Sequence, residues 1–210
     1  MLRAHRSTAA PLVPGCELLP CQDQFVPEQG SLRGRLLVAA PPLVDPNFDR
    51  TVVLILEHGD EGGLGLVLNR RSGTTLDDVF PEWHELASSP AVVFTGGPVS
   101  ADAVIALARR RYADIEGFVE VVDGLGTIDL ADDPLDVGAS LAALRVFAGY
   151  AGWAAGQLEA EVAQGAWFVV TMHPDDAFAD NPERLWRDVL RRQRGRLALF
   201  SNYPDDATVN

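Results

Sequence analysis

Thr51-Val52-Val53-Leu54-Ile55-Leu56-Glu57-His58 and Leu64-Gly65-Leu66-Val67-Leu68-Asn69 are the two stretches that decide the fold, and Gly59-Asp60-Glu61-Gly62-Gly63 joins them. Both stretches have the length of a strand and are apolar almost throughout. Because the connection between them is short, acidic and rich in glycine, we predict a β-hairpin here. Neither strand alternates apolar with polar residues, so we expect both faces of the hairpin to be covered.

The apolar runs on either side of this hairpin predict a chain that is rich in strands. Further strands are expected at residues 34–40, 91–95, 118–122, 127–130, 141–149 and 166–172. Short helices are expected at residues 75–80, capped by Thr74 or Thr75, at residues 154–164, and from Pro182 onwards. Residues 103–108 are ambiguous between helix and strand. Because this order is not a regular βαβ alternation, we predict an α+β fold with a curled, largely antiparallel sheet and helices packed outside it.

The length of 210 residues fits one domain with extensions. Residues 1–33 contain four prolines and no sustained periodicity, so we interpret them as an N-terminal extension that is partly disordered. Residues 34–203 are predicted to form a single domain, followed by a C-terminal tail at residues 204–210. Both cysteines, Cys16 and Cys21, lie in the extension, where their spacing fits either half of a metal site or a local disulfide.

The charge of the chain restricts its partners. The formal net charge is −13, and every basic residue other than histidine is an arginine, because the sequence contains no lysine. A globally acidic protein is repelled by nucleic acid, so direct binding to DNA is disfavoured. No run of apolar residues approaches the length of a membrane-spanning helix, and no signal-peptide pattern opens the chain. We therefore expect a soluble protein of the cytoplasm.

Four blocks of the sequence carry a recognisable pattern. They are Gly34-Arg35-Leu36-Leu37-Val38-Ala39-Ala40-Pro41 with Asp45-Pro46-Asn47-Phe48, Arg50-Thr51-Val52-Val53 with Glu57-His58, Gly65-Leu66-Val67-Leu68-Asn69-Arg70 with Gly96-Gly97-Pro98-Val99, and Gly149-Tyr150-Ala151-Gly152-Trp153 with Gly156-Gln157-Leu158-Glu159, Glu161 and Trp167. Together these blocks resemble the bacterial AlgH/YqgE family. The resemblance covers residues 34–190, and the end of the chain looks like the actinobacterial branch. It implies a branched β-sheet rolled into a barrel-like body with flanking helices. It also implies a cytoplasmic protein of unknown function that carries the label of a transcriptional regulator.

One group of polar and glycine-rich residues is the best candidate for a binding pocket. Glycines permit close approach of the backbone, and the tyrosine and tryptophan offer aromatic walls with polar tips. The alternative interpretation, which we favour, is that these glycines let a strand pack tightly against the following helix while the aromatic rings fill the core. The candidate residues are Asn47, Arg50, His58, Asn69, Gly96, Gly97, Gly149, Tyr150, Gly152, Trp153, Gln157 and Glu159.

The chemistry of these residues leaves three classes of function open. The first, which we favour, is a non-enzymatic binding or regulatory protein that acts on a protein or a small molecule. The second is a hydrolase that uses His58 as a base together with Asn47 and Arg50. The third is a regulator that binds DNA directly, although no basic recognition helix is visible. His84 and His173 have no second ligand at metal spacing, so neither a metal nor a cofactor is predicted.

Overall fold

The computed structural model describes residues 30–43, 45–112 and 115–204. Most of the predicted N-terminal extension, with Cys16 and Cys21, lies outside the described residues, as does the tail after Pro204. The domain boundaries at residues 34 and 203 stay a prediction. Within the described ranges, no helix has the length and apolar character needed to cross a bilayer.

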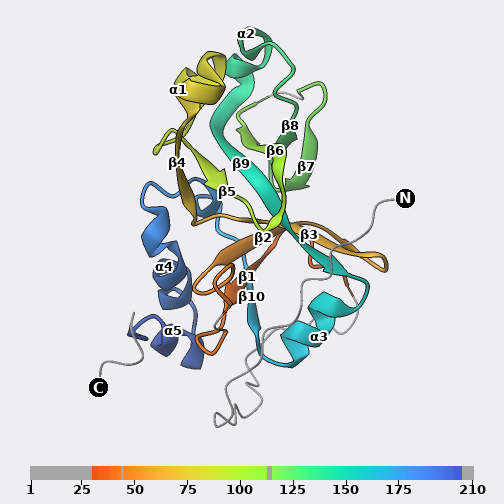
Figure 1. Ribbon diagram of the computed structural model, residues 1–210, viewed down its shortest axis with the longest axis vertical. Helices are drawn as coiled ribbons and strands as arrows, with labels where there is room; N and C mark the ends of the chain where they lie inside the picture. The colour runs from red at the N-terminus through yellow and green to blue at the C-terminus, as the bar shows by residue number, and fades with distance from the viewer. Residues whose placement is uncertain (1–29, 44, 113–114, 205–210) are drawn as a thin grey trace.

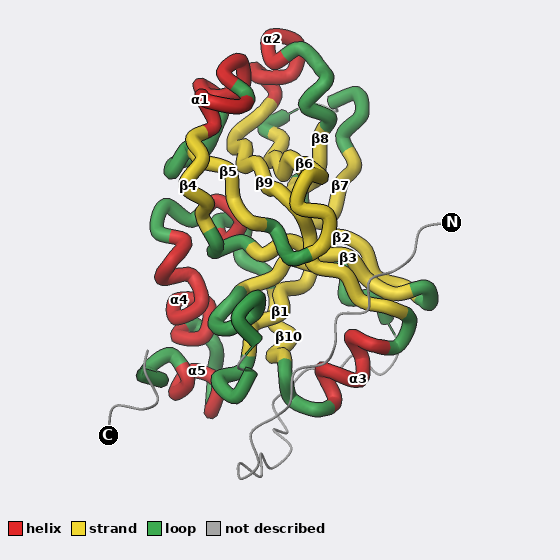
Figure 2. Tube along the Cα trace, viewed as in Figure 1, coloured by secondary structure: helices red, strands yellow, loops and turns green. Residues whose placement is uncertain are grey.

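A curled, mostly antiparallel sheet of 10 strands forms a half-barrel. Its main path runs in the order β10-β1-β2-β3-β9-β6-β8-β7, and β5 pairs with both β4 and β9. Figure 2 shows the strands at the centre and the helices on the outside. The strands are β1 (Arg35–Ala39), β2 (Val52–Gly59), β3 (Gly62–Val67), β4 (Arg71–Thr75), β5 (Val92–Thr95), β6 (Val99–Arg110), β7 (Val119–Val122), β8 (Leu125–Ile128), β9 (Leu141–Ala154) and β10 (Trp167–Thr171).

Strand β9 is where the sheet branches. It is 14 residues long and runs through both halves of the molecule (Figure 1). Its last residues pair with β3 in antiparallel fashion, and Phe147 and Ala148 pair with β5 in parallel. Its other edge pairs with β6 for most of its length. The predicted branched, antiparallel sheet is therefore confirmed.

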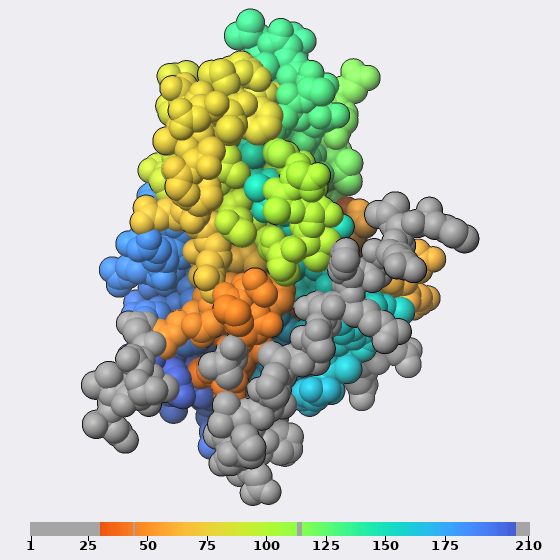
Figure 3. Space-filling model, in the orientation of Figure 1, coloured from red at the N-terminus to blue at the C-terminus, as the bar shows by residue number. Residues whose placement is uncertain are grey.

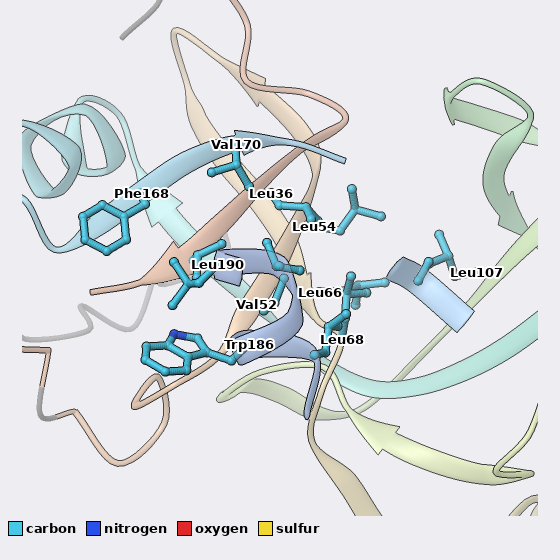
Figure 4. Close-up of a cluster of buried hydrophobic side chains, with 14 of the residues drawn as sticks. Leu36, Val52, Leu54, Leu66, Leu68, Leu107, Phe168, Val170, Trp186 and Leu190 are labelled. Carbon is cyan, nitrogen blue, oxygen red and sulfur yellow. The ribbon is translucent and has the colours of Figure 1, made fainter. Parts of the chain in front are cut away.

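The predicted hairpin is formed by β2 and β3, and both of its faces are covered as expected. On one face, Leu36, Leu54 and Leu66 pack against Trp186 and Leu190, as Figure 4 shows. Their sequence neighbours point to the other face, because side chains alternate along a strand. There Leu37, Val53 and Val67 pack with Leu158 and Val162.

The helices lie on the outside of this sheet. In Figure 1, α4 and α5 lie on one side of β1 and β10, and α3 lies on the other. The helices are α1 (Leu76–Val79), α2 (Pro134–Val137), α3 (Gln157–Ala163), α4 (Leu185–Arg191) and α5 (Arg196–Phe200), and the 3₁₀ turns are η1 (Pro81–Leu86), η2 (Gly138–Ser140), η3 (Asp176–Phe178) and η4 (Pro182–Arg184).

The elements differ from the prediction in several places, and strand β8, for example, begins at Leu125 instead of residue 127. Residues 103–108 belong to a strand, since β6 pairs with β8 and β9 on its two edges. Strand β9 continues five residues beyond Gly149 to Ala154, so helix α3 begins only at Gln157. Thr75 does precede α1, but its hydroxyl donates to the Asp78 carboxylate at 2.5 Å and does not cap the helix backbone. Strand β4, helix α2 and helix α5 were not predicted.

Candidate functional site

The close backbone approach expected around Gly149 exists, but its partner is the turn between β5 and β6. A Cβ atom added to Gly96 would lie 2.2 Å from the carbonyl oxygen of Gly149, and one added to Gly97 would lie 2.2 Å from the carbonyl carbon of Tyr150. Gly149 itself has a φ of 71°, which favours glycine. These glycines are needed for the crossing of two chain segments, and the space beside them is filled by backbone.

The aromatic residues of the same block form a cluster around one carboxylate. The indole N–H groups of Trp153 and Trp167 each donate to Oε2 of Glu161 at 2.9 Å. The Gln157 amide donates to Oε1 of the same residue at 2.9 Å. Phe48 packs against both indoles, with centroids 6.4 and 5.5 Å away. Trp153 is therefore a core residue, and Gln157 positions Glu161. The role of Glu161 as the shared acceptor was not predicted from the sequence.

His58 lies near the C-terminal end of β2 and forms hydrogen bonds with the segment that precedes β1. Its Nδ1 atom accepts a hydrogen bond from the backbone N–H of Leu32 at 3.2 Å. The hydroxyl of Ser31 donates to the carbonyl oxygen of His58 at 2.9 Å. On the opposite side, Nε2 lies 3.1 Å from Oε1 of Glu159, without the alignment of a hydrogen bond. Only 7% of the imidazole side chain is exposed.

Asn47, Arg50 and Asn69 lie at the opposite end of β2. The Asn69 side chain donates to the carbonyl oxygen of Arg50 at 2.9 Å and accepts from the N–H of Val52 at 3.0 Å. The guanidinium of Arg50 contacts the carbonyl oxygen of Pro204. The backbone N–H of Asn47 donates to the Asp45 carboxylate at 2.7 Å, within the connection between β1 and β2. This connection is orange in Figure 3 and lies on the face drawn there.

This placement contradicts the grouping of His58 with Asn47 and Arg50 that the hydrolase hypothesis required. Strand β2 runs from Val52 to Gly59 between them. At a rise of about 3.3 Å per residue, the backbones of Arg50 and His58 are about 25 Å apart. Proton transfer needs hydrogen-bond contact, so these three side chains cannot form one catalytic set. The grouping was wrong because strand β2 holds these residues at its two ends.

A groove between several strands of the half-barrel was not predicted from the sequence. Its volume is about 740 Å³. The lining comes from β2, β3, β6, β7, β8 and neighbouring loops, and its apolar members include Leu56, Leu64, Phe80, Val104, Ile105, Val119, Val121 and Leu130. Val104 and Val119 stand out, because 46% and 57% of their surface is exposed. Polar lining comes from Arg33, Glu57, Thr127 and Asp129.

A short strap of residues Leu32–Gly34 closes one side of this groove. Arg33 lines it and donates from its guanidinium to the carbonyl oxygen of Glu120 on β7. The backbone N–H of Gly34 donates to Ile55 on β2 at 2.8 Å. A Cβ atom on Gly34 would lie 2.8 Å from that of Val122, so the strap fits closely between β2 and β7. The strap thus joins the two sides of the open barrel.

Arg145 on β9 is a second feature that sequence analysis missed. It is only 2% exposed, and its guanidinium donates to the carbonyl oxygens of Ala177, Ser89 and Ala179 at 3.0, 2.7 and 3.1 Å. The guanidinium carbon also lies 4.3 Å from the centre of the Phe94 ring. Burial lowers the pKa of Arg145 to about 10, and the charge of Asp180 opposes that shift. At neutral pH it is a buried cation that joins strand β9 to two loop segments, one at Ser89 and one at residues 177–179.

Three arginines of the C-terminal region interact with other groups of the protein. Arg192 pairs with the buried carboxylate of Asp176, with both N–O distances at 2.5 Å. Arg191 pairs with Asp188 at 2.9 Å, and Arg187 donates to the carbonyl oxygen of Ser201 at 2.7 Å. Across the described parts of the chain, no three histidine, cysteine or acidic side chains gather as a metal site would require.

Comparison with known proteins places this architecture among its relatives. The AlgH-like family model matches residues 36–198. A UPF0301 protein of Streptomyces avermitilis is 50% identical over 188 residues, which are 87% of this chain and 97% of that protein. A UPF0301 protein of Mycobacterium tuberculosis is 41% identical over 194 residues, covering 90% and 96% of the two chains.

Two solved structures have the same fold. The crystal structure of a Corynebacterium diphtheriae protein superposes with a TM-score of 0.79 at 32% identity, covering 83% of this chain and 93% of that one. The solution structure of the AlgH protein from Pseudomonas aeruginosa gives a TM-score of 0.62 at 31% identity, covering 88% and 99%.

Proposed function

This chain belongs to the AlgH-like family, and from that premise we propose that it is a non-enzymatic binding protein whose groove receives an apolar segment of a protein partner. The observation that carries this proposal is the exposure of Val104 and Val119 within a concave surface. Apolar side chains that line a hollow and remain exposed are typical of binding sites.

The chemistry of the lining supports binding over catalysis. Among the described residues that line the groove there is no histidine, serine or cysteine, and the polar members are Arg33, Glu57, Thr127 and Asp129. Such a set can orient a bound peptide through a few hydrogen bonds while the apolar walls supply most of the affinity. The His58 hollow, of about 460 Å³, is bordered by acidic residues of the β2–β3 turn and shares Glu57 and Leu64 with the groove.

The experiment uses the dye 8-anilinonaphthalene-1-sulfonate as an apolar probe of the full chain. We expect its fluorescence to rise on binding and the amide signals of Val104, Ile105 and Val119 to shift in heteronuclear NMR spectra. The double variant V104D/V119D should bind the dye roughly tenfold more weakly, because the bound apolar ligand would bury the two new charges.

The matched control is V79D/L199D, which adds the same two charges at exposed apolar residues outside the groove. This control should bind the dye like the wild type. Equal loss in both double variants, or amide shifts scattered over the whole surface, would overturn the assignment of the groove as the binding site.

A further inference from the structure

We propose that the partner segment received by the groove carries an arginine or lysine beside its apolar residues, and that this basic side chain enters the His58 hollow. The His58 hollow lies at the end of the β2–β3 hairpin and is lined by residues 57–64 and Trp153. The inference rests on the function proposed above and deepens it by naming the chemistry of the partner.

The groove and the His58 hollow adjoin each other. Glu57 and Leu64 line both of them, and these two residues are paired between β2 and β3. The volumes are about 740 Å³ for the groove and about 460 Å³ for the His58 hollow. A segment that lies in the groove can therefore continue over this pair of residues into the His58 hollow without leaving the surface of the protein.

The His58 hollow is lined by carboxylates whose charge no arginine of the described chain neutralises. Its acidic lining residues are Glu57, Asp60 and Glu61, and all three are exposed. Among the described residues, none of them forms an ion pair with an arginine. In Figure 1 the turn between β2 and β3 projects from the edge of the molecule. A concave surface with charges of one sign attracts a ligand of the opposite charge.

A fourth carboxylate, that of Glu159, lies beside the same hollow. Its Oε1 atom is 3.1 Å from Nε2 of His58, but Nε2 is buried without an aligned hydrogen bond to it. The Glu159 side chain is 56% exposed. It therefore adds a further negative charge that a bound cation can contact.

The arrangement of these charges favours a basic side chain over a metal ion or an acidic partner. Across the parts of the chain that the structure describes, no three acidic or histidine side chains gather as a metal would require. A guanidinium or ammonium group on a long stem needs no such convergence and brings several hydrogen-bond donors. An acidic segment would find only Arg33 as a permanent cation among the described residues that line the two hollows, and Arg33 already donates to the carbonyl oxygen of Glu120.

Two synthetic peptides test the inference on the full chain. The first is acetyl-Leu-Val-Leu-Gly-Arg-Arg-amide, and the second has citrulline in place of both arginines, which keeps their shape without their charge. In NMR titrations we expect the arginine peptide to bind about fivefold more tightly and to shift the amide signals of Asp60, Glu61 and Val104. The difference in affinity should shrink when the salt concentration rises to about 0.5 M.

The variant E57Q/D60N/E61Q removes the charges of the His58 hollow and nearly preserves the size of the side chains. We expect it to bind both peptides with the affinity that the wild type has for the citrulline peptide. A fivefold preference for the arginine peptide that survives in this variant would overturn the proposal.

The matched control is D77N/E82Q/E85Q, which removes three negative charges at exposed residues outside both hollows. Its net charge equals that of E57Q/D60N/E61Q, so it separates a local effect from the overall acidity of the protein. It should keep the preference for the arginine peptide. Equal loss of the preference in both triple variants would show that the peptide responds to net charge alone, and would overturn the proposal.

The dye experiment keeps the failure of this inference distinct from failure of the proposed function. Equal affinity of the wild type for both peptides, or binding of neither, would remove the basic residue from the partner. If dye binding were still lost in V104D/V119D, the groove would remain a binding site. Dye binding that ignores V104D/V119D would remove the proposed function itself, and this inference with it.

Discussion

Nδ1 of His58 accepts a hydrogen bond from the backbone N–H of Leu32 at 3.2 Å, so the histidine holds the strap Leu32–Gly34 against the end of β2. A ring nitrogen that accepts a hydrogen bond carries no proton, so in the neutral imidazole the proton lies on Nε2, which faces Glu159. Nδ1 therefore has a structural role as an acceptor, which explains why a histidine stands at the end of β2.

The first prediction concerns the hydrogen bond between Leu32 and His58. H58A removes the acceptor for Leu32 and should lower the free energy of unfolding by about 1–2 kcal/mol, and hydrogen exchange at Leu32 should become faster. H58N is the rescue variant, because its side-chain oxygen can take the place of Nδ1. Urea denaturation and amide exchange measure the two effects. Equal exchange rates at Leu32 in H58A and the wild type would contradict the assigned role.

The second prediction concerns the carboxylate between the two indoles. E161A leaves the N–H groups of Trp153 and Trp167 without their acceptor in a largely buried cluster. We expect a loss of about 2–4 kcal/mol in unfolding free energy, measured by urea denaturation, together with a change in tryptophan fluorescence. E159A on the same helix is the control, since that carboxylate is 56% exposed and should cost less than about 1 kcal/mol.

The third prediction concerns the crossing of the chain at the β5–β6 turn. G97A would place a methyl group 2.2 Å from the carbonyl carbon of Tyr150, which lies in the middle of the sheet and cannot move away cheaply. The variant should lose more than about 3 kcal/mol or fail to fold, as judged by circular dichroism and thermal unfolding. G59A is matched to it, because an added Cβ meets no atom within 4 Å. Similar melting temperatures for the two variants would refute the crowding argument.

How far the sequence predicts this molecule depends on how local each feature is. The β2–β3 hairpin and the strand at β10 were predictable, because their apolar runs and turns are contained in short stretches. The tight approach at Gly149 was also predictable, although its partner, Gly97, was not. Contacts between residues some fifty positions apart leave no pattern that a single sequence exposes.

The groove could not be predicted for a related reason. Val104 and Val119 are ordinary strand residues by composition, and only the folded arrangement of the strands leaves them exposed beside the groove. The burial of Arg145 could not be predicted either, since an arginine within an apolar strand suggests a position at the edge of the sheet. The partners that make its burial possible come from loops more than thirty residues away in either direction.

The fourth prediction concerns Arg145 at neutral pH. R145M keeps much of the side-chain volume but leaves the carbonyl oxygens of Ser89, Ala177 and Ala179 without a donor. Each buried acceptor without a partner costs about 1–3 kcal/mol, whereas removal of a buried charge recovers part of its desolvation penalty. We expect a net loss of at least about 2 kcal/mol in urea denaturation at pH 7. An R145M variant as stable as the wild type would show that the three contacts contribute nothing net.

The pH dependence of the same pair of proteins gives a sharper test. Burial lowers the pKa of Arg145 to about 10, while in the unfolded chain the side chain keeps the higher pKa of an ordinary arginine. Between these values the unfolded state binds more protons than the folded state, so the wild type gains unfolding free energy as pH rises. R145M lacks the guanidinium but shares all other titratable groups with the wild type. The difference in unfolding free energy between the two proteins at each pH therefore reports on Arg145 alone. That difference should be constant from pH 7 to about 9 and should then grow in favour of the wild type, by up to about 1.4 kcal/mol per pH unit, above the folded pKa. A difference that stays constant through pH 11 would mean that the three carbonyl oxygens and Phe94 hold the charged form as firmly as water does.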